Sequence, residues 1–311
     1  MDLPLVSVIC VNYNQAEYIE DAISSVLTQS YKNIELIIVD DHSLDSSKET
    51  INSIRIRNPE IRIVMLEKNS GICKAFNSGF RISNGEYIID LAADDILLPD
   101  RIKEGIKEFQ EKGIKYGVNF TNAAFINNSA QTTGFQYKIN GQGITEDYVP
   151  EGSIYRELLE KYTICAPTMM TRRSVLEALH GYDETLFYED FDFWVRSSRI
   201  TNYCFTNKIL VKKRIHHDSL STHQYKKNSK LLISTLQVCL KAESLNETDT
   251  EKKALISRTQ YELKKALQFY NWEVGIKFSE IILRNTNSIA SKIFYSVLKS
   301  ALSLISGYHN P

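Results

Sequence analysis

Residues 86–100, EYIIDLAADDILLPD, run from an apolar segment typical of a buried strand into the adjacent carboxylates Asp94 and Asp95 and then into a proline. Two like charges at such close range raise each other's pKa and destabilise a fold unless a cation or hydrogen-bond donors neutralise them. The pair therefore predicts a neutralising partner, either a cation or a set of hydrogen-bond donors, at the end of this strand.

Three earlier segments, residues 5–11, 34–40 and 62–66, also predict strands, and polar residues follow each of them. Apolar residues recur at helical spacing between these strands, within residues 19–27, 46–57 and 72–82. Such alternation favours a mainly parallel α/β sheet covered by helices on both faces, which binds ligands beyond the carboxyl ends of its strands. At any one strand end a turn or a helix cap is the better explanation of the polar residues. Four strand ends in succession predict a ligand site, with these residues at its rim: Asn12 to Asn14, Asp40, Asp41, Asn69, Asp94 and Asp95.

Length and composition predict an ordinary globular protein of two domains. The chain has 311 residues, of which 43% are apolar and 24% charged, with a net charge of −1. We expect an α/β domain over residues 1–225 and a helical region over residues 226–311. The helical region carries 13 Lys and Arg against 7 Asp and Glu, a net of +6, so the first domain is acidic. An acidic domain argues against binding to nucleic acid, which requires a clustered basic face.

The five cysteines and the N-terminus indicate a cytoplasmic protein. The cysteines are scattered, odd in number and without C-x-x-C spacing, which is typical of a reduced compartment and argues against a zinc site. The N-terminus shows neither a basic leader nor a cleavage site, and no apolar run reaches the roughly 18 residues needed to cross a bilayer.

Four helical stretches are predicted for the tail, at residues 230–245, 251–272, 272–285 and 288–306. The last one has an apolar side formed by Ile289, Ile293, Phe294, Val297, Leu298, Leu302 and Ile305. This side either packs on the first domain or a second copy of the chain, or lies on a membrane surface. Packing or self-association is favoured, because Lys292 and Lys299 are the only basic residues of the stretch.

No glycine-rich phosphate loop is present in the sequence. Neither G-x-G-x-x-G nor G-x-x-x-x-G-K-[ST] occurs, and the loop after the first strand, VNYNQAEYI, has no glycine. An acid-rich site that accepts a nucleotide diphosphate requires a divalent metal, Mn²⁺ or Mg²⁺, between carboxylate and phosphate.

Four motifs together resemble family 2 inverting glycosyltransferases with the GT-A fold. They are VSVICVNYNQAEYIEDAISSVLTQSYKNIELIIVDDHSLDSS, NSGICKAFNSGF, GEYIIDLAADD and FYEDFDFWVR, and the resemblance covers about residues 5–217. It implies transfer of a sugar, with inversion, from a nucleotide diphosphate sugar to an acceptor hydroxyl.

The resemblance also implies roles for residues at the rim. Tyr13 would stack on the base, Asp40 or Asp41 would accept a hydrogen bond from it, and Lys74 would lie near the base or the phosphates. Asp94 would hold the ribose or the metal, and Asp95 the metal and the diphosphate. We expect the neighbouring Asn12, Asn14 and Asn69 to belong to the same donor site.

The chain departs from the common D-x-D-D pattern of such relatives, because it has Ala92-Ala93-Asp94-Asp95. One carboxylate is missing, which predicts weaker or less selective metal binding at a functional site.

An inverting displacement needs a base that takes the proton of the acceptor hydroxyl. The motif FYEDFDFWVR, residues 187–196, offers Asp190 as first choice, which matches the aspartate of the E-D motif in the family that the chain resembles, and Glu189 as second choice. The competing interpretation is that these acids merely favour a helix start.

Two interpretations of residues 211–223, VKKRIHHDSLSTH, stay open. In the first interpretation the segment follows an edge strand, His216 or His217 completes the metal shell or contacts the diphosphate, and Arg214 binds phosphate. Alternatively the segment is a polar surface loop.

The predicted function is metal-dependent transfer from a UDP-sugar to a glycan or lipid-linked glycan during synthesis of a surface polysaccharide. The protein would be cytoplasmic, either free or peripherally bound at the inner face of the cell membrane. The alternative is a degenerate protein that binds a nucleotide-sugar or a partner without catalysis, for which Ala92 is the best support. A nucleotidyltransferase is disfavoured, because VNYNQAEYI lacks a glycine-rich basic loop.

Overall fold

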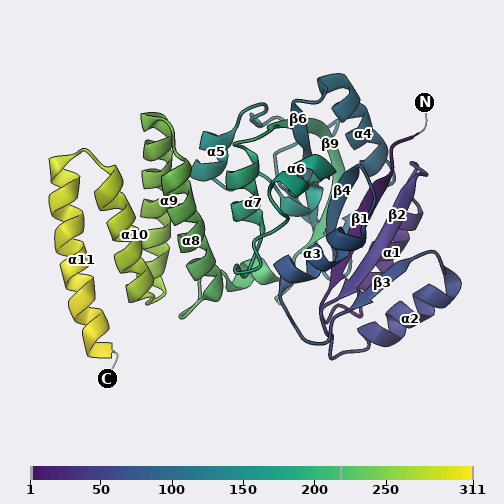
Figure 1. Ribbon diagram of the computed structural model, residues 1–311, viewed down its shortest axis with the longest axis horizontal. Coiled ribbons are helices and arrows are strands. Elements are labelled where there is room, and N and C mark those ends of the chain that lie inside the picture. Colours follow the sequence, from purple (N-terminus) through teal and green to yellow (C-terminus); the bar gives the residue numbers. More distant parts are fainter. Residues whose placement is uncertain (1–2, 218, 310–311) are drawn as a thin grey trace. The chain divides into compact units, whose positions relative to one another are not determined.

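The computed structural model describes residues 3–217 and 219–309 (Figure 1). The chain divides into two compact units, which we call the sheet unit and the helical unit. The sheet unit holds the residues up to Ile154 together with Ile164–Thr185 and Arg196–His216. The helical unit holds Tyr155–Thr163, Leu186–Val195 and the chain from His217 onward, so it is larger than the predicted region 226–311.

Four parallel strands form one half of the sheet, in the order β3-β2-β1-β4. Their bounds are β1 Val6–Asn12, β2 Ile34–Asp40, β3 Arg62–Met65 and β4 Tyr87–Ala92. The helices between them are α1 Ile19–Leu27, α2 Ser47–Arg57 and α3 Ile72–Ile82, close to the predicted segments. The sequence therefore predicted this half of the sheet and its connections correctly.

The other half makes the whole sheet mixed rather than mainly parallel. The order continues β4-β8-β6-β9-β5, with β5 Ile96–Leu97, β6 Tyr116–Ile126, β8 Met170–Arg172 and β9 Asn202–Arg214. β8 is antiparallel to both β4 and β6, whereas β6 and β9 are parallel. A further short strand, β7 Thr132–Phe135, pairs with β6. The predicted edge strand before His216 is β9, and this expectation was wrong, because β9 pairs with β6 on one side and β5 on the other.

Helices cover both faces of the parallel strands, because alternate residues of β1 point to opposite sides. Val6, Val8 and Cys10 belong to the core that includes residues of α1, α2 and α4 (Arg101–Lys112). On the other face, α3 lies close to β1 and β2 at Gly79, where an added Cβ would come within 2.6 Å of a methyl group of Ile9. Glycine thus permits the close approach of α3.

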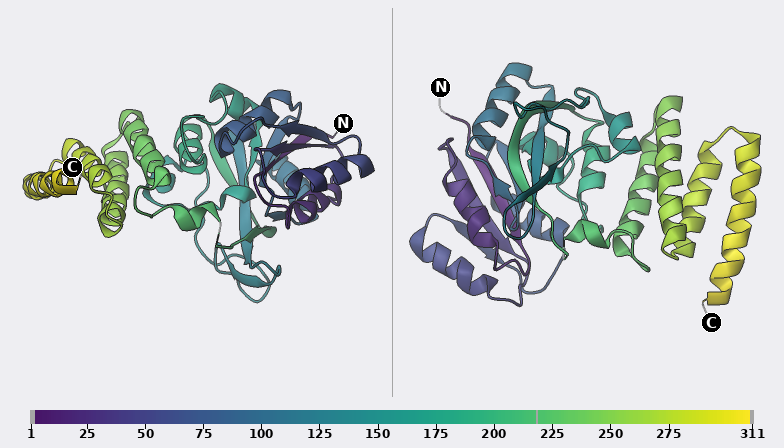
Figure 2. Two further views of the ribbon diagram at one scale, coloured as in Figure 1. Left: turned by 90° about the horizontal axis from the view of Figure 1, so that it is seen from below. Right: turned by 180° about the vertical axis from the view of Figure 1, so that it is seen from behind.

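The helical unit contains four long helices in succession, each packed on the next (Figures 1 and 2). They are α8 Lys230–Leu245, α9 Asp249–Gln268, α10 Trp272–Asn285 and α11 Ile289–His309. Thr248 begins α9 with a capping box, in which its side chain and that of Glu251 each accept a hydrogen bond from the other's backbone N–H. Within residues 3–217 and 219–309, no helix combines the length and the apolar character needed to traverse a bilayer.

Shorter elements complete both units. The sheet unit includes a 3₁₀ turn at Ala166–Thr168 and α6 Arg173–Ala178, while the helical unit includes α5 Tyr155–Glu160 and a 3₁₀ turn at Leu220–His223. Helix α7, Asp190–Ser197, begins in the helical unit. The five cysteines are all free thiols and all buried, and burial raises the pKa of Cys204 to about 12.

Candidate functional site

The carboxyl ends of the parallel strands meet at one edge of the sheet, which we call the rim. Asn12 pairs with Asp40 across β1 and β2, Val11 pairs with Ala92 across β1 and β4, and Asp40 pairs with Met65 across β2 and β3. The strands therefore end within about one residue of each other. The polar residues that the sequence placed after these strands lie together, as predicted.

Asp40 and Asn12 form a buried hydrogen-bond cluster with Ser43. The Asn12 amide donates to Asp40 at 2.8 Å and to the Ser43 hydroxyl at 3.0 Å, and that hydroxyl donates to Asp40 at 2.6 Å. Ser43 Oγ also accepts from the main-chain N–H of Asn14 at 2.9 Å, and Asn14 Oδ1 accepts from the N–H of Leu44 at 2.7 Å. The cluster holds the loops after β1 and β2 together. Ser43 was not singled out from the sequence, although its place after Asp40-Asp41 suits a serine that bonds a nearby carboxylate.

Asp41 holds the loop that leads into α3. Its two carboxylate oxygens accept from the backbone N–H groups of Ser70 at 2.7 Å and Gly71 at 2.8 Å. Gly71 has φ +86°, a conformation that favours glycine. Burial raises the pKa of Asp41, against the lowering effect of these two hydrogen bonds. The carboxylate of Asp41 is thereby fixed beside the rim, and its oxygens can still accept further hydrogen bonds.

Three residues assigned from the sequence to the nucleotide-sugar donor site lie at the surface of the rim. Tyr13 is 40% exposed, so its ring is available for stacking. Lys74 is exposed in the first turn of α3, and Asn69 is exposed with its Oδ1 accepting from the Gly71 N–H at 3.2 Å. Asn12 lies behind them, fully buried, and its Oδ1 receives no hydrogen bond within the described chain.

The turn after β4 carries the acidic pair. The N–H of Asp95 donates to the carbonyl of Ala92 at 3.0 Å, and that of Ala93 donates to Val11 at 3.0 Å, so the turn is attached to β1. Asp95 is only 3% exposed. Burial, and next the charge of Asp94, raise the pKa of Asp95 well above its usual range.

Arg214, at the end of β9, also holds this turn, which is thus attached to β9 as well as to β1. Its main-chain N–H donates to Asp95 Oδ1 at 2.8 Å, and its guanidinium donates to the carbonyl oxygens of Asp94, Asn127 and Asn128. The guanidinium carbon lies 4.4 Å from the ring centroid of Tyr18. With a side chain only 1% exposed, Arg214 anchors the acidic turn and is not placed for the phosphate contact considered above.

His216 lies beside Asp94, with Nε2 3.0 Å from Asp94 Oδ2, and its ring lies 5.6 Å from that of Tyr18. The structure therefore places the imidazole of His216 beside the carboxylate of Asp94, the residue that precedes Asp95 in the acidic turn. No group of three or more such ligands in metal-binding geometry occurs among residues 3–217 and 219–309. Mg²⁺ is commonly held by one or two carboxylates together with substrate phosphates. The residues present fit that type of site, because burial first and the charge of Asp94 second raise the pKa of Asp95, and a bound cation would favour the ionised carboxylate.

Glu189 and Asp190 belong to the helical unit, where Asp190 begins α7. Asp192, two residues later, has a side chain 1% exposed and pairs with Lys241 at 2.6 Å. Acidic residues at this position also suit the positive end of the helix dipole. The assignment of Asp190 or Glu189 as base thus stays a prediction.

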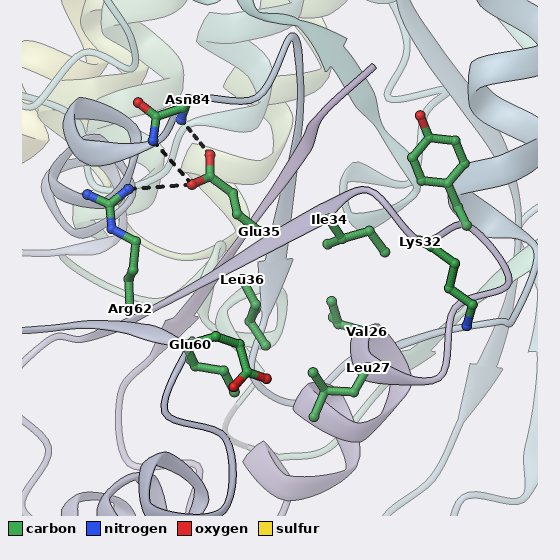
Figure 3. A pocket seen from close by; sticks show the side chains of 11 residues that line it. Val26, Leu27, Lys32, Ile34, Glu35, Leu36, Glu60, Arg62 and Asn84 are labelled. Carbon is green, nitrogen blue, oxygen red and sulfur yellow. Dashed lines mark hydrogen bonds and ion pairs between the residues drawn. The ribbon is translucent and has the colours of Figure 1, made fainter. Parts of the chain in front are cut away.

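A cavity of about 460 Å³ lies at the opposite, amino ends of β2 and β3 (Figure 3). Glu35 lies in it and accepts from Arg62 at 3.4 Å and from the backbone N–H of Gly85 at 3.0 Å. These hydrogen bonds and that of Ser7 lower the pKa of Glu35. Its carboxylate is satisfied by the protein, and the cavity is separate from the rim.

Comparison with known proteins identifies the family. Residues 7–179 match the model of glycosyl transferase family 2. The chain belongs to this family. An uncharacterized glycosyltransferase of Rickettsia typhi is 28% identical over 217 residues, covering 68% of this chain and 64% of that protein. The chondroitin synthase of Pasteurella multocida is 27% identical over 300 residues, which cover 94% of this chain but 29% of the synthase. The chain thus spans less than two thirds of these relatives.

Solved glycosyltransferase structures share the fold of this family member. The S. aureus TarS fragment 1-349 in complex with UDP-GlcNAc has a TM-score of 0.69 at 17% identity, covering 90% of this chain and 81% of the fragment. The mannosyltransferase PcManGT of Pyrobaculum calidifontis, in complex with GDP-Man and Mn²⁺, has a TM-score of 0.60 at 14% identity, covering 98% of this chain and 82% of PcManGT. The predicted GT-A fold, with a helical C-terminal region, is confirmed.

Proposed function

We propose that this family 2 member is an inverting glycosyltransferase that moves a sugar from a UDP-sugar to a hydroxyl of a glycan or lipid-linked glycan. The observation that carries the proposal is the Asp94–Asp95 turn at the rim. It presents two adjacent carboxylates, one of them buried with a raised pKa, where GT-A strands end. Such a pair is stabilised by a cation and is otherwise costly.

The donor would occupy the rim around Tyr13, Asp41 and Lys74. Tyr13 offers an exposed ring for the base, Asp41 offers acceptor oxygens, and Lys74 offers a cation for phosphate. Both aspartates are buried, but Asp40 accepts three hydrogen bonds from Asn12 and Ser43 whereas Asp41 accepts two, so Asp41 keeps more acceptor capacity for the base. The UDP-GlcNAc bound to TarS supports a uridine nucleotide as donor.

Asp95, Asp94 and His216 are the residues that would hold Mn²⁺ or Mg²⁺. When bound, the ion supplies positive charge where the diphosphate leaving group gains negative charge. The Mn²⁺ of PcManGT supports this part of the proposal. Ala92, in place of a third carboxylate, predicts that the ion is held weakly without nucleotide.

Asp190 would take the proton of the acceptor hydroxyl as this hydroxyl attacks the anomeric carbon, with Glu189 as second candidate. The chondroitin synthase and the hyaluronan synthase of Pasteurella multocida, 27% and 28% identical, support a glycan acceptor and a role in a surface polysaccharide. We propose that the protein acts in the cytoplasm, free or at the inner face of the membrane.

The proposal is tested by incubating the protein with UDP-sugars and MnCl₂ and measuring the UDP that is released. Asp95→Asn should lower release at least about 100-fold, because a buried electrostatic contact to the leaving group is lost. Asp100→Asn is the control, since Asp100 is an exposed acid bonded to Ser30 near the same turn. Equal release by wild type and Asp95→Asn would refute the metal site.

The second candidate is a protein that binds a nucleotide-sugar without turnover, favoured by the missing carboxylate at Ala92. It predicts that UDP-sugars raise the melting temperature of the wild type by mass action. It also predicts that no UDP is released with Mn²⁺ or Mg²⁺ from any donor so bound.

A further inference from the structure

The segment that carries Asp190 is attached to helix α8 on both sides of that residue. Before Asp190, the N–H of Phe187 donates to Ser234 Oγ at 2.9 Å, and the Tyr188 and Thr235 hydroxyls lie 2.7 Å apart. After Asp190, the Lys241 ammonium donates to Asp192 at 2.6 Å. Three side chains of one helix therefore hold a short segment at three points.

These contacts are partly buried. Ser234 and Thr235 have no exposed surface, the side chain of Asp192 is 1% exposed and that of Lys241 is 33% exposed. A partly buried ion pair of this kind adds little net stability, because the buried carboxylate loses its hydration. Its clear consequence is geometric, since it fixes the first turn of α7, which begins at Asp190.

Tyr162, and Arg258 of helix α9, contact the same segment. The Tyr162 hydroxyl lies 3.2 Å from that of Tyr188, and the guanidinium carbon of Arg258 lies 4.0 Å from the Tyr162 ring centroid and 5.3 Å from that of Phe191. Arg258 is in turn paired with the buried Glu262 at 3.1 Å. The aromatic residues flanking Glu189 and Asp190 are thus held by a cation and by hydroxyl groups.

We propose that Lys241 and Thr235 of α8 are positioning residues for the base, which lies in the same helical unit. The inference rests on the proposed function, in which Asp190 receives the acceptor proton. A general base must lie within about 2.6–3.2 Å of the atom that loses the proton. Displacement by about 1 Å costs on the order of 100-fold in rate. Lys241 acts through Asp192, and Thr235 acts through Tyr188.

The test compares Thr235→Val and Lys241→Met with Thr259→Val. Thr259 is the matched control, a buried threonine of α9 whose hydroxyl donates only to the carbonyls of Leu255 and Ile256 in its own helix. We expect kcat to fall about 10-fold for Thr235→Val and between about 10- and 100-fold for Lys241→Met. The donor KM should be unchanged in all three, and kcat should be unchanged in the control. Wild-type kcat in both test variants would overturn the inference.

A double variant separates positioning from stability. Lys241→Met leaves the Asp192 charge without its lysine and should lower the melting temperature, whereas adding Asp192→Asn removes that charge and should restore it. If the pair positions the base, kcat stays low in the double variant although its stability has returned. Recovery of kcat together with the melting temperature would show a merely structural role.

Asp190→Asn and hydrogen exchange distinguish this inference from the proposed function. An inactive wild type, or full activity of Asp190→Asn, would refute the proposed function or its base. Exchange of residues 187–193 is measured in every case, and it should rise in Thr235→Val and Lys241→Met but not in Thr259→Val. Unchanged exchange overturns the inference even if the protein transfers no sugar. If Asp190→Asn has low activity while Thr235→Val and Lys241→Met keep the wild-type kcat, only the positioning role is refuted.

Discussion

Arg214 holds Asp95 through its main chain and Asp94 through its side chain. The N–H of Arg214 lies 2.8 Å from Asp95 Oδ1, and Nε lies 3.1 Å from the carbonyl oxygen of Asp94. One residue at the end of β9 therefore fixes the acidic turn that follows β4, although about 120 residues separate them in sequence.

Arg214→Met should weaken both the fold and the proposed metal site. The change leaves the partly buried carbonyl oxygens of Asp94, Asn127 and Asn128 without this donor, and an unsatisfied group costs about 1–3 kcal/mol when it is fully buried. We expect an unfolding free energy lower by at least about 2 kcal/mol in urea. We also expect an affinity for UDP with Mn²⁺ lower by about 10-fold in calorimetry, since the turn loses its support.

Arg57→Met is the control for this variant, because Arg57 makes an exposed ion pair with Glu20 and an exposed hydrogen bond to the Ser53 carbonyl. Exposed substitutions of this kind stay within about 0.5 kcal/mol. Equal stability of the two variants would contradict the anchoring role of Arg214.

Asp95 should make stability without metal fall as the pH rises. Its folded pKa is raised by burial and by Asp94, so the native state binds more protons than the unfolded chain at pH values between the unfolded pKa, about 3.9, and the folded pKa. Without metal, Asp95→Asn should therefore melt about 2–4 °C above wild type near pH 7.5, a difference that shrinks toward pH 5. Adding MnCl₂ and UDP should stabilise only the wild type, and more strongly at higher pH. If the difference in melting temperature between the two proteins without metal stayed constant between pH 5 and pH 7.5, the prediction would be wrong.

Asp41→Asn should loosen the loop before α3 and weaken nucleotide binding. The carboxylate accepts from Ser70 and Gly71 with separate oxygens, whereas an amide has only one acceptor oxygen and would leave one N–H unsatisfied, at about 1–3 kcal/mol. Thermal melting with and without UDP measures both effects. Asp183→Asn is a matched control, because one oxygen of Asp183 accepts from both donors of Thr185 and an amide can retain those bonds. A larger loss in the control would refute the prediction.

The exposed side of α11 should govern self-association. Ile289, Ile293 and Val297 are 76%, 63% and 65% exposed, and Leu302 of the same helix is buried. Contiguous apolar residues at a surface mark an interaction site. Ile293→Ser combined with Val297→Ser should therefore shift the sedimentation coefficient toward that of a monomer. An unchanged distribution, together with wild-type binding to anionic vesicles that the variant lacks, would favour the membrane surface instead.

Local patterns predicted the parallel half of the sheet and most helices. Helices α3, α8 and α10 have the bounds that the sequence indicated, because apolar spacing and stop signals such as Asn84-Gly85 are local. The convergence of Asn12, Asp40 and Asp95 also followed from the sequence, since consecutive parallel strands end at one edge.

The second half of the sheet and the buried contacts of the site were not predictable in this way. The sequence predicted an edge strand before His216, yet Val211 and Lys212 of β9 pair with β5 while the same strand pairs with β6. Such pairing depends on residues far apart in the chain. For the same reason the sequence did not predict the hydrogen bonds of Arg214 or the contact between Lys241 and Asp192. A charged residue that pairs with a distant partner has the same sequence pattern as an exposed one.

The state of the five cysteines gives this chain a practical advantage. All are buried thiols, and a thiol with a raised pKa, such as that of Cys204, reacts slowly because the thiolate is the nucleophile. A maleimide dye should therefore label a single cysteine introduced at an exposed position such as Lys68, in the loop before α3, without removal of the native ones. Fluorescence from that dye would report nucleotide arrival directly, in a molecule that is otherwise unaltered.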